Sequence, residues 1–571
     1  MRNLEVADIF DDIADFLELK NENPFRIRAY RRASQNIKSL NEDIEEILKR
    51  DGLLEILGIG KDLALKIKEI ITEGRLKYLE ELKREFPEGL AEIMNIPNIG
   101  PKTAKLLYEK LNIRDIDTLE EYAKAHRLSS LPGIREKTEE NILKGIELVR
   151  RGRERMSLGI ALPLAEKIIN DLKDSSGIKR ITYAGSLRRM KETIRDIDIL
   201  VSSNSPNIIM DNFVKLPVVK EIISKGKTKS SILTKEGIQV DIRVVKPDSY
   251  GAAMVYFTGS KAHNIRIREL ANKKGFKINE YGVFRKSDGK KIAGNEEIGV
   301  YNAIGLPYIE PELREDQDEI EAAINGRLPD ILKLEDIKSD LHIHTKYSDG
   351  ANSLKKIIDA CKELGYEYIA ICDHSKSLKV AGGLSEKDLM KQVGQIRKFN
   401  KISKDIKILA GSEVDILDDG SLDFDGDILK ELDLVVASIH TGFKQAREKL
   451  TYRILKAMEN KYVNVISHPT GRLMGARDAY ELNLDRIFKQ AADTNTAIEI
   501  NAFPQRLDLT DINCKRAREF NVNFAIGTDT HSLPQLNYIR FGVAVARRGW
   551  IEAGSILNAL SFKEFLKRIK K

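Results

Sequence analysis

Two aspartates lie one residue apart in the segment RDIDILV, which is otherwise apolar. Successive side chains of a strand point to opposite faces, so Asp196 and Asp198 share one face while Ile197 and Ile199 share the other. Carboxylates this close raise each other's pKa unless a cation lies between them. Because exposed acids on an edge strand show the same pattern, the neighbouring residues must decide whether this pair binds a metal.

A second predicted strand, IQVDIRVV, places Asp241 on its polar face. If it pairs with the first strand, three carboxylates converge, and such a group can hold two divalent ions about 4 Å apart for an in-line phosphoryl displacement. Magnesium suits a site made of hard oxygen ligands. Gly185 and Ser186 precede the first pair and are predicted to open a helix, whose free backbone N–H groups can bind a triphosphate. Arg188 and Arg189 add positive charge there.

The blocks GSLRRMKETIRDIDILV, VDIRVV and YFTGSKAHNIRIRELANKKGFKINEYGVF resemble the palm and thumb of family X DNA polymerases. The resemblance implies that Asp196 and Asp198 hold Mg²⁺ or Mn²⁺ and that Asp241 helps to take the proton from the primer 3′-hydroxyl. It also implies an incoming nucleotide beside Gly185, Ser186, Arg189, Tyr256, Phe257, Gly259, Lys261, Asn264 and Arg268. Lys261 stands where better-known animal members have an acid. For Tyr256 and Phe257, core packing is the alternative interpretation.

Length and composition restrict the class of protein. The chain has 571 residues, which suggests three to five domains, with 42% hydrophobic and 32% charged residues. No apolar run approaches the roughly 20 residues of a transmembrane helix, and the acidic start of the chain does not resemble a secretion signal. The three cysteines are scattered, which fits a reducing cytoplasm. A net charge of +7 is mild, so local basic patches must attract any polyanion.

The first 155 residues are predicted to be helical and contain an internal repeat. LLEILGIGKDLALKIKEII and LAEIMNIPNIGPKTAKLLYEKL share an apolar run, a tight glycine turn and an amphipathic helix, and LSSLPGIREKTEENILKGI is a degenerate third copy. Each copy resembles a helix-hairpin-helix, whose turn can bind a DNA phosphate through backbone amides. Ordinary helical hairpins also turn on glycine. The predicted DNA contacts are Arg28, Arg32, Gly58, Gly60, Lys61, Gly100 and Lys102.

Lys66 lies where some family X members carry a lysine that forms a Schiff base with an abasic sugar. A nucleophilic lysine must be neutral, and Asp62 on the same predicted helix would instead keep it protonated. An ordinary surface lysine therefore remains the alternative to a lyase nucleophile.

Seven short apolar runs follow an acidic, proline-containing connector and alternate with predicted helices. They are LHIHT, YIAICDHS, KILAGSEVDI, DLVVASIH, VNVISHP, TAIEINA and NFAIGTDTH. This alternation predicts a parallel sheet, closed as a distorted barrel with one unit fewer than the eight-fold form.

Six of the eight histidines in the chain lie at or just beyond the ends of these runs. A lone histidine is usually structural or solvent-exposed, but six at equivalent strand ends predict a metal cluster of two or three ions. Imidazole and carboxylate ligands fit zinc, manganese or iron. Cys372 is interpreted as a buried neighbour. The predicted ligands are His342, His344, Asp349, His374, Glu413, His440, His468, Asp529 and His531.

The pattern DLHIHTKYSDG, CDHS, GSEVDI, ASIH, SHPTGR and GTDTHS resembles the PHP (polymerase and histidinol phosphatase) family over residues 335 to 571. The resemblance implies metal-dependent hydrolysis of phosphate esters with Mn²⁺ or Zn²⁺. Asp373, Arg472 and Arg506 are candidates for supporting the ligands or contacting phosphate, with ordinary ion pairs as the alternative.

The two resemblances together match the bacterial and archaeal family X arrangement. We therefore expect a monomeric, cytoplasmic and nucleoid-associated enzyme that fills short gaps in DNA with dNTPs during base excision repair and works beside a ligase. The barrel would process 3′ ends as a 3′–5′ exonuclease and nick at abasic sites. The expected units are a helical DNA-binding domain (1–85), fingers with a helix-hairpin-helix (86–155), palm (156–250), thumb (251–316), linker (317–334) and PHP domain (335–571).

Three other interpretations stay open. The PHP domain could be structural, with metals that only hold the barrel together. The chain could be a repair nuclease with a weak polymerase palm, or a nucleotidyltransferase that acts on RNA.

Overall fold

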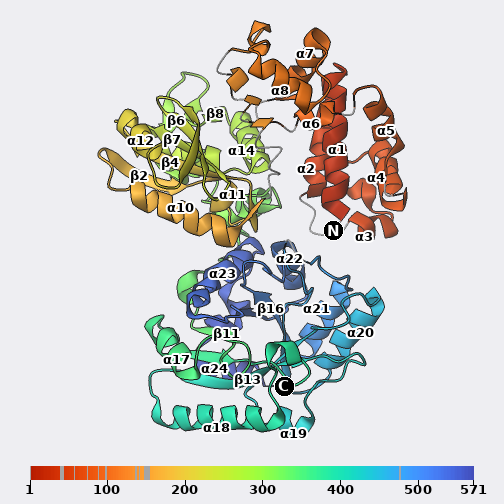
Figure 1. Cartoon of the computed structure of the whole chain (residues 1–571), viewed down its shortest axis with the longest axis vertical. Coiled ribbons are helices and arrows are strands. Elements are labelled where there is room, and N and C mark those ends of the chain that lie inside the picture. The colour runs from red at the N-terminus through yellow and green to blue at the C-terminus, as the bar shows by residue number, and fades with distance from the viewer. Residues whose placement is uncertain are drawn as a thin grey trace.

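The computed structural model shows two helical units beside a mixed α/β region, with a barrel below both (Figure 1). No helix in the described part of the chain is long and apolar enough to cross a membrane. The structure describes residues 2–38, 44–56, 58–73, 75–87, 89–94, 96, 99–135, 138–140, 142–143, 145–146, 155–474 and 477–570.

The N-terminal part consists of helices, as predicted, and one apolar core runs through both helical units. Gly58 has a φ of +81°, and helix α4 starts at Lys61, directly after the first predicted turn. Helix α7 starts at Pro101, after the second turn, whose Asn98 lies outside the described residues. The helices are α1 (Arg2–Leu19), α2 (Pro24–Lys38), α3 (Ile44–Lys49), α4 (Lys61–Glu73), α5 (Lys77–Arg84), α6 (Leu90–Met94), α7 (Pro101–Leu111) and α8 (Ile116–Lys124).

The palm contains a five-stranded mixed sheet in the order β2-β4-β7-β6-β5. The two strands with the aspartates, β4 and β7, are parallel neighbours at its centre. A short pair, β1 with β3, precedes β4. The elements are β1 (Met156–Ser157), α10 (Leu158–Leu172), β2 (Ile178–Tyr183), α11 (Gly185–Arg188), β3 (Thr193–Ile194), β4 (Asp196–Ser203), α12 (Pro206–Phe213), β5 (Val219–Lys225), β6 (Lys229–Thr234) and β7 (Gln239–Val245).

The thumb combines helices with a three-stranded antiparallel sheet, β10-β9-β8. The predicted linker is packed against other units, because Ile320 is buried in the thumb core and the Leu332 N–H donates to the Ile551 carbonyl of the barrel. Trp550 of the barrel lies in the same core. The elements are α13 (Tyr250–Thr258), α14 (Lys261–Lys273), β8 (Phe276–Asn279), β9 (Gly282–Arg285), β10 (Lys291–Ala293), α15 (Glu297–Ala303) and α16 (Glu319–Ile324).

The C-terminal unit is a seven-stranded parallel barrel, as predicted, with strands in sequence order from β11 to β17. A parallel bridge between Ile343 and Thr530 connects the two ends of the sheet. The strands are β11 (Ser339–Ile343), β12 (Tyr368–Ile371), β13 (Lys407–Asp415), β14 (Leu434–Ser438), β15 (Val463–Ile466), β16 (Ala497–Asn501) and β17 (Phe524–Gly527). The helices are α17 (Leu354–Glu363), α18 (Glu386–Ile402), α19 (Gly426–Leu429), α20 (Arg447–Met458), α21 (Leu484–Asp493), α22 (Asp511–Arg518), α23 (Ile539–Arg548) and α24 (Phe562–Arg568).

The palm and the barrel pack against each other directly. Buried apolar residues of both units form one continuous core. Gly159 lies so close to Pro504 that an added Cβ would be 2.3 Å from the proline Cβ. Ion pairs also join the two units, including Glu166 with Arg540 at 2.9 Å and Glu192 with Arg472 at 2.7 Å.

Candidate functional site

Two palm aspartates are direct neighbours across the sheet. Asp198 of β4 and Asp241 of β7 are register partners, and both line a pocket with Lys229, Arg243 and Phe257. Burial, followed by the charges of Asp196 and Asp241, raises the pKa of Asp198 to about 7. The structure thus brings together the acids that strand alternation placed on one face, although Asp196 itself is exposed.

Asp241 is held through both carboxylate oxygens. The Gln239 side chain donates to Oδ1 at 2.8 Å, and the Lys229 ammonium lies 3.0 Å from Oδ2. A divalent ion beside Asp198 fits this chemistry, because burial and the neighbouring acids disfavour the charged form of this carboxylate unless a further cation lies nearby.

Helix α11 lies against Asp198. Gly185 has a φ of +61°, and a Cβ added there would be 2.3 Å from Asp198 Oδ2, so only glycine fits. The Ala184 N–H donates to the Asp198 carbonyl at 2.8 Å. The helix that carries Ser186 therefore begins beside the aspartates, where the sequence predicted a phosphate-binding helix start.

The remaining nucleotide-side residues gather on α13 and α14. Tyr256 and Phe257 form an edge-to-face pair with ring centroids 5.0 Å apart, and Arg243 lies over Phe257. Asn264 donates to the Tyr256 carbonyl at 2.7 Å, and Arg268 donates to the Asn264 carbonyl at 2.9 Å. Tyr256 remains 39% exposed and Phe257 lines the aspartate pocket, so neither is a fully buried core residue. Lys261 is exposed at the start of α14.

The two neighbouring arginines have different surroundings. Arg188 donates to the Glu297 carboxylate and to the Thr258 hydroxyl. Its positive charge is therefore neutralised by Glu297 within the fold. Arg189 donates to the Thr258 carbonyl and, through Nε, to Glu315 at 2.9 Å. Gly259 also lies against Arg189, since a Cβ there would be 3.2 Å from its Nη1.

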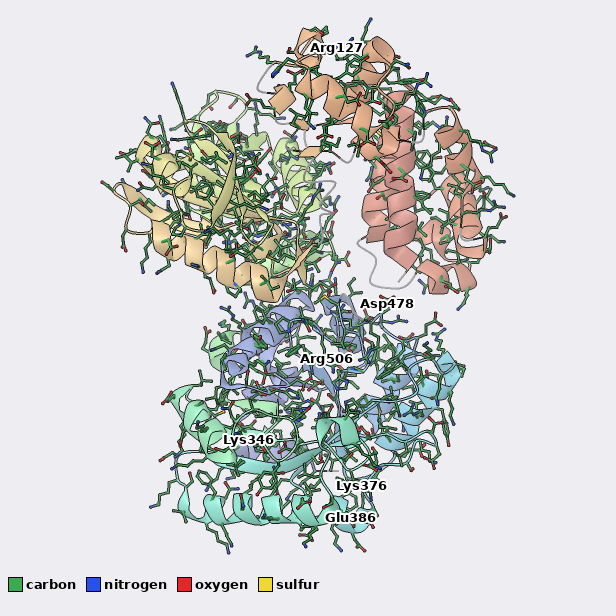
Figure 2. All side chains as sticks on the ribbon, viewed as in Figure 1. Arg127, Lys346, Lys376, Glu386, Asp478 and Arg506 are labelled. Atoms are coloured by element: carbon green, nitrogen blue, oxygen red, sulfur yellow. The ribbon has the colours of Figure 1, made fainter. Side chains whose placement is uncertain are left out.

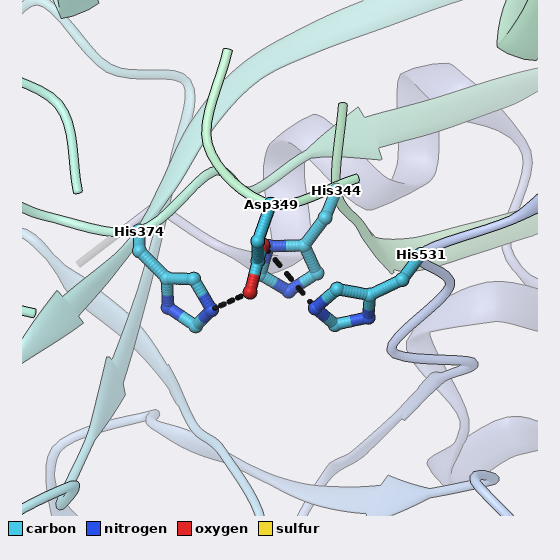
Figure 3. A group of neighbouring side chains, drawn as sticks. All are labelled: His344, Asp349, His374 and His531. Atoms are coloured by element: carbon cyan, nitrogen blue, oxygen red, sulfur yellow. Dashed lines mark ion pairs between the residues drawn. The ribbon is translucent and has the colours of Figure 1, made fainter. Parts of the chain in front are cut away.

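All nine predicted barrel ligands come together at the ends of the strands. One group within ligating distance is drawn in Figure 3, where Asp349 lies between His374 and His531. The three groups of neighbouring ligand atoms are His344, Asp349, His374 and His531; His342, His344 and Asp529; and His374, Glu413 and His440.

Glu413 is the central carboxylate of this cluster. Its oxygens lie 2.8 Å from His374 Nδ1, 2.9 Å from His468 Nε2 and 3.3 Å from His440 Nε2. They also lie 3.5 Å from His342 and 3.7 Å from His344. One buried acid therefore faces five imidazoles.

The chemistry of the donor set fits divalent ions. Buried ring nitrogens of His342, His344, His374 and His468 have no hydrogen-bond partner among the described residues. Burial alone would lower the pKa of His374, but Glu413 and Asp349 raise it to about 10. Metal ions would replace these protons between the same imidazoles and carboxylates. Cys372 is buried with its thiol directed at the Leu341 carbonyl, and it belongs to none of the three ligand groups.

Further acids orient the ligands and were missed from the sequence. Glu499 accepts from His342 Nδ1 at 2.7 Å and from the His468 N–H at 2.7 Å, and Asp415 pairs with His440 Nδ1. Such partners set the tautomer and orientation of a ligating histidine. An acid inside the apolar run TAIEINA was the available signal for Glu499.

Replacing Glu499 with glutamine is expected to raise the Mn²⁺ concentration for half-maximal hydrolysis by about 10- to 100-fold, because His342 loses the charge that orients it. A manganese titration of the hydrolytic activity measures this effect. Glu499→Asp should recover part of it. An unchanged titration midpoint would show that Glu499 has no role in holding the ligand.

The three residues proposed to support the barrel ligands do different things. Asp373 accepts from the Thr345 N–H and hydroxyl and from Ser348, and so holds the loop that carries Asp349. Arg506 Nε lies 3.3 Å from the ligand Asp529, and its buried Nη1 has no partner among the described residues. Figure 2 marks Arg506 in the half of the barrel nearer the palm.

Arg472 contacts the backbone of Arg506 and is engaged through Nε and Nη2. It donates to the backbone carbonyls of Arg506 and Leu507, both at 2.6 Å, and to Glu192 of the palm at 2.7 Å. Arg472 therefore connects the barrel to the palm. Arg506 instead keeps its Nη1 available to donate to a phosphate.

The predicted DNA contacts lie on exposed parts of the helical units. Arg28, which lies over the 75% exposed ring of Phe25, and Arg32 are exposed on α2, and Lys61 and Lys102 are exposed at the starts of α4 and α7. Cβ atoms at Gly60 and Gly100 would meet nothing within 4 Å, so both turns are open to a ligand.

Lys66 pairs with Asp62 at 2.6 Å and lies 5.4 Å from the centroid of the Tyr78 ring. This is the ion pair that the sequence indicated would keep the lysine protonated.

Family models match four parts of the chain. They are a helix-hairpin-helix domain (residues 1–76), a SAM-like helix-hairpin-helix tandem (90–147), a DNA polymerase beta thumb (253–315) and a PHP domain (340–503).

Among curated proteins, the chain is 38% identical over 573 aligned residues to the DNA polymerase/3′-5′ exonuclease PolX of Bacillus subtilis, covering 100% of both chains. A probable phosphatase of Thermoanaerobacter sp. is 29% identical over 41% of this chain and 95% of its own. DNA polymerase lambda of Rattus norvegicus is 24% identical over 55% of this chain and 56% of its own. Because the first of these similarities covers every unit in the same order, this chain belongs to the PolX family of DNA polymerases with a C-terminal PHP domain.

Proposed function

We propose that this chain is a DNA-directed DNA polymerase that fills short gaps during base excision repair and that processes 3′ ends with its barrel as a 3′–5′ exonuclease. The observation that carries the proposal is that one chain contains both the pairing of Asp198 with Asp241 across the palm sheet and, in the barrel, three groups of side chains that could hold metal ions. A polymerase cannot extend a blocked terminus, and a tethered hydrolase acts at high effective concentration.

The palm residues have distinct roles in nucleotide addition. Divalent ions at Asp196 and Asp198, Mg²⁺ or Mn²⁺, would neutralise charge on the phosphorus oxygens. Asp241 accepts the proton of the primer 3′-hydroxyl. The start of α11 and Arg189 bind the triphosphate. Tyr256 and Phe257, with the Gly259 turn, face the sugar, and Asn264 and Arg268 contact the minor-groove side of the new pair.

The barrel binds the 3′-terminal phosphodiester. Its nine ligands would hold two or three Mn²⁺ or Zn²⁺ ions, which stabilise charge on the phosphoryl oxygens during hydrolysis. Arg506 donates its unpartnered Nη1 to the same phosphate, a contact supported by its burial beside Asp529. The same chemistry extends to 3′-phosphates and to cleavage at abasic sites.

The helix-hairpin-helix turns bind gapped or nicked duplex DNA through its phosphates, so binding weakens steeply with salt. The enzyme acts as a monomer in the cytoplasm, at the nucleoid, with a ligase sealing its product. We propose six units in the chain, from the helical DNA-binding domain at residues 1–85 to the PHP domain at residues 335–571. The shared core of the palm and barrel supports treating these two units as one rigid block.

Two assays on one gapped duplex test the proposal. The wild-type chain should add a dNTP to a free 3′-hydroxyl, and with Mn²⁺ it should remove a 3′-phosphate from a blocked primer. Incorporation without hydrolysis would favour a structural PHP domain, and hydrolysis without incorporation would favour a nuclease with a weak palm. A preference for RNA ends would indicate a different nucleotidyltransferase.

A lyase activity of the N-terminal unit can be tested separately. Because the Lys66 side chain is engaged in an ion pair with Asp62, borohydride should trap little covalent adduct between the wild-type chain and a 5′ abasic end. Asp62→Asn is expected to increase the trapped fraction if Lys66 is the nucleophile, and Lys66→Ala should then remove it. Trapping that is unaffected by Lys66→Ala would exclude this lysine.

A further inference from the structure

A cluster of charged residues, most of them largely buried, joins three units of the chain beside α11. Glu315, at the end of the thumb, lies 2.9 Å from Arg189 Nε and 3.8 Å from Lys191 Nζ of the palm. It also accepts from Arg548 Nη1 of the barrel helix α23 at 3.0 Å. Arg548 in turn donates to Asp511 of α22 at 2.7 Å. We call these five residues the Glu315 cluster.

Arg548 also contacts the backbone of the palm directly. Its Nη1 donates to the Arg189 carbonyl at 2.7 Å, across 359 residues of sequence. Only 4% of the Arg548 side chain is exposed, and 12% of the Arg189 and Glu315 side chains. Although burial alone would raise it, Lys191, Arg189 and Arg548 hold the pKa of Glu315 well below its usual range. The Glu315 carboxylate is therefore ionised at neutral pH.

The same cluster fixes where the Arg189 guanidinium lies. Arg189 donates through Nε to Glu315 and through Nη1 to the Thr258 carbonyl, beside the Gly259 turn. The residue before Glu315, Arg314, accepts from the Ser260 N–H at 2.9 Å, so one segment holds both the turn and the arginine. Arg189 Nη2 makes no hydrogen bond within the described part of the chain, which leaves a donor for a ligand.

Arg189 is also the C-cap of α11, whose first residue lies against Asp198. A displacement of the Arg189 backbone would therefore move the helix that borders the aspartate pocket. The barrel also holds the next part of this segment, because Arg472 donates to Glu192, the residue directly before β3 and four residues before β4 begins at Asp196.

We propose that Arg548 of the PHP barrel is a positioning residue of the polymerase site, which holds Arg189 in place for the triphosphate through the Arg189 carbonyl and the Glu315 carboxylate. The proposal rests on the proposed polymerase function. If Arg548 has this role, the barrel contributes to nucleotide binding in the palm in addition to carrying its own hydrolytic centre. The planar guanidinium suits this role because it can bond a carbonyl and two carboxylates at fixed angles, which an ammonium cannot.

The test compares Arg548→Met and Arg548→Lys with the wild type in single-nucleotide gap filling. Arg548→Met is expected to raise the KM for the dNTP by about tenfold, with kcat changed less than about twofold, because a misplaced arginine weakens binding of the nucleotide. Arg548→Lys keeps the charge but not the geometry, so it should recover only part of the loss. Manganese-dependent 3′-end hydrolysis should be unchanged in both variants.

Arg547 offers a matched control on the same helix. It also crosses from barrel to thumb, pairing with Glu312 at 2.7 Å and donating to the Leu332 carbonyl, but it makes no contact with Arg189 in the described part of the chain. Arg547→Met should leave the KM for the dNTP within about twofold of the wild type, even if it lowers the melting temperature. A general loosening of the interface would instead raise KM in both variants.

A double mutant distinguishes the positioning of Arg189 by Arg548 from a general stabilisation of the interface between the palm and the barrel. If Arg548 acts through Arg189, Arg548→Met should add no further increase in KM to that of Arg189→Met. Additive effects, or an unchanged KM in Arg548→Met, would overturn the proposal. If Arg548→Met does not fold, Asp511→Asn, which removes one partner of Arg548, should raise KM in the same direction.

Nucleotide binding can also be measured without incorporation. The experiment measures the equilibrium binding of the complementary dNTP to the enzyme on a gapped duplex whose primer ends in a dideoxynucleotide. Wild-type enzyme that binds the dNTP but does not extend a free primer would contradict the proposed function, while weaker binding by Arg548→Met would still support the role of Arg548. Equal binding by the variant and the wild type would contradict that role.

Discussion

Replacement of Asp198 with asparagine is expected to lower the rate of nucleotide incorporation by about 10³-fold or more. The side chain keeps its shape but loses the charge that would hold divalent ions beside Asp241, its partner across the sheet. Metal ions supply several kcal/mol of transition-state stabilisation, and about 4 kcal/mol corresponds to this factor. Primer extension on a single-nucleotide gap measures the loss, and 3′-end hydrolysis by the barrel should be unchanged.

The same variant should be more stable than the wild type in EDTA. Burial and the neighbouring acids raise the pKa of Asp198 to about 7, so the folded chain favours the protonated form of this group. A raised carboxyl pKa costs stability as pH rises from the unfolded value of about 4 to 7, and the cost is then constant. Asp198→Asn should therefore unfold at a higher temperature at pH 8 and show little difference at pH 4.

Asp171→Asn serves as the control, since Asp171 is an exposed acid on α10 of the same unit. It should change neither incorporation nor the melting temperature. Incorporation by Asp198→Asn within tenfold of the wild type would refute a metal-binding role for Asp198.

Replacement of Glu413 with glutamine should abolish metal-dependent 3′-end hydrolysis, with a loss of about 10³-fold. Glu413 faces five imidazoles of the ligand set, and the neutral amide cannot balance the cations that they would share. Metal analysis of the purified protein should show at least one ion fewer per chain. Gap filling should remain within about twofold, because the palm aspartates are a separate centre.

Glu363→Gln, at the exposed end of α17, is the matched control and should keep both the metal content and the hydrolytic activity. Normal metal content with lost hydrolysis in Glu413→Gln would assign the acid to the reaction rather than to ion binding. Full hydrolytic activity would exclude the barrel cluster as the active centre.

Local patterns in the sequence were sufficient to predict the parts of both centres that lie on regular strands. Side-chain alternation placed Asp196 and Asp198 on one face of a strand and Asp241 on the polar face of another, and the structure shows that the two strands pair with Asp198 opposite Asp241. The six late histidines were predicted to converge because the carboxyl ends of parallel strands meet at one rim of a barrel. The barrel prediction needed only the alternation of strands with helices, whereas the palm prediction also required the two strands to pair.

The contacts that orient these residues depend on distances through space that no local pattern reports. In the sequence, nothing distinguishes Glu499 from another acid inside an apolar strand. The closed barrel brings it into contact with His342, which lies 157 residues earlier in the chain. The linker after residue 317 has the composition of a connector, yet its Ile320 and Ile331 pack into the thumb core together with Trp550 of the barrel.

The sequence by itself determined the order of the units, the seven-stranded barrel and the residues that could bind cations, because these follow from hydrophobic periodicity and residue type. Only the tertiary structure decided that Glu413 lies at the centre of the histidines and that Arg548 reaches Arg189. Charges are placed by the packing of whole domains against one another. That packing depends on the summed shape of many side chains, which no short stretch of sequence contains.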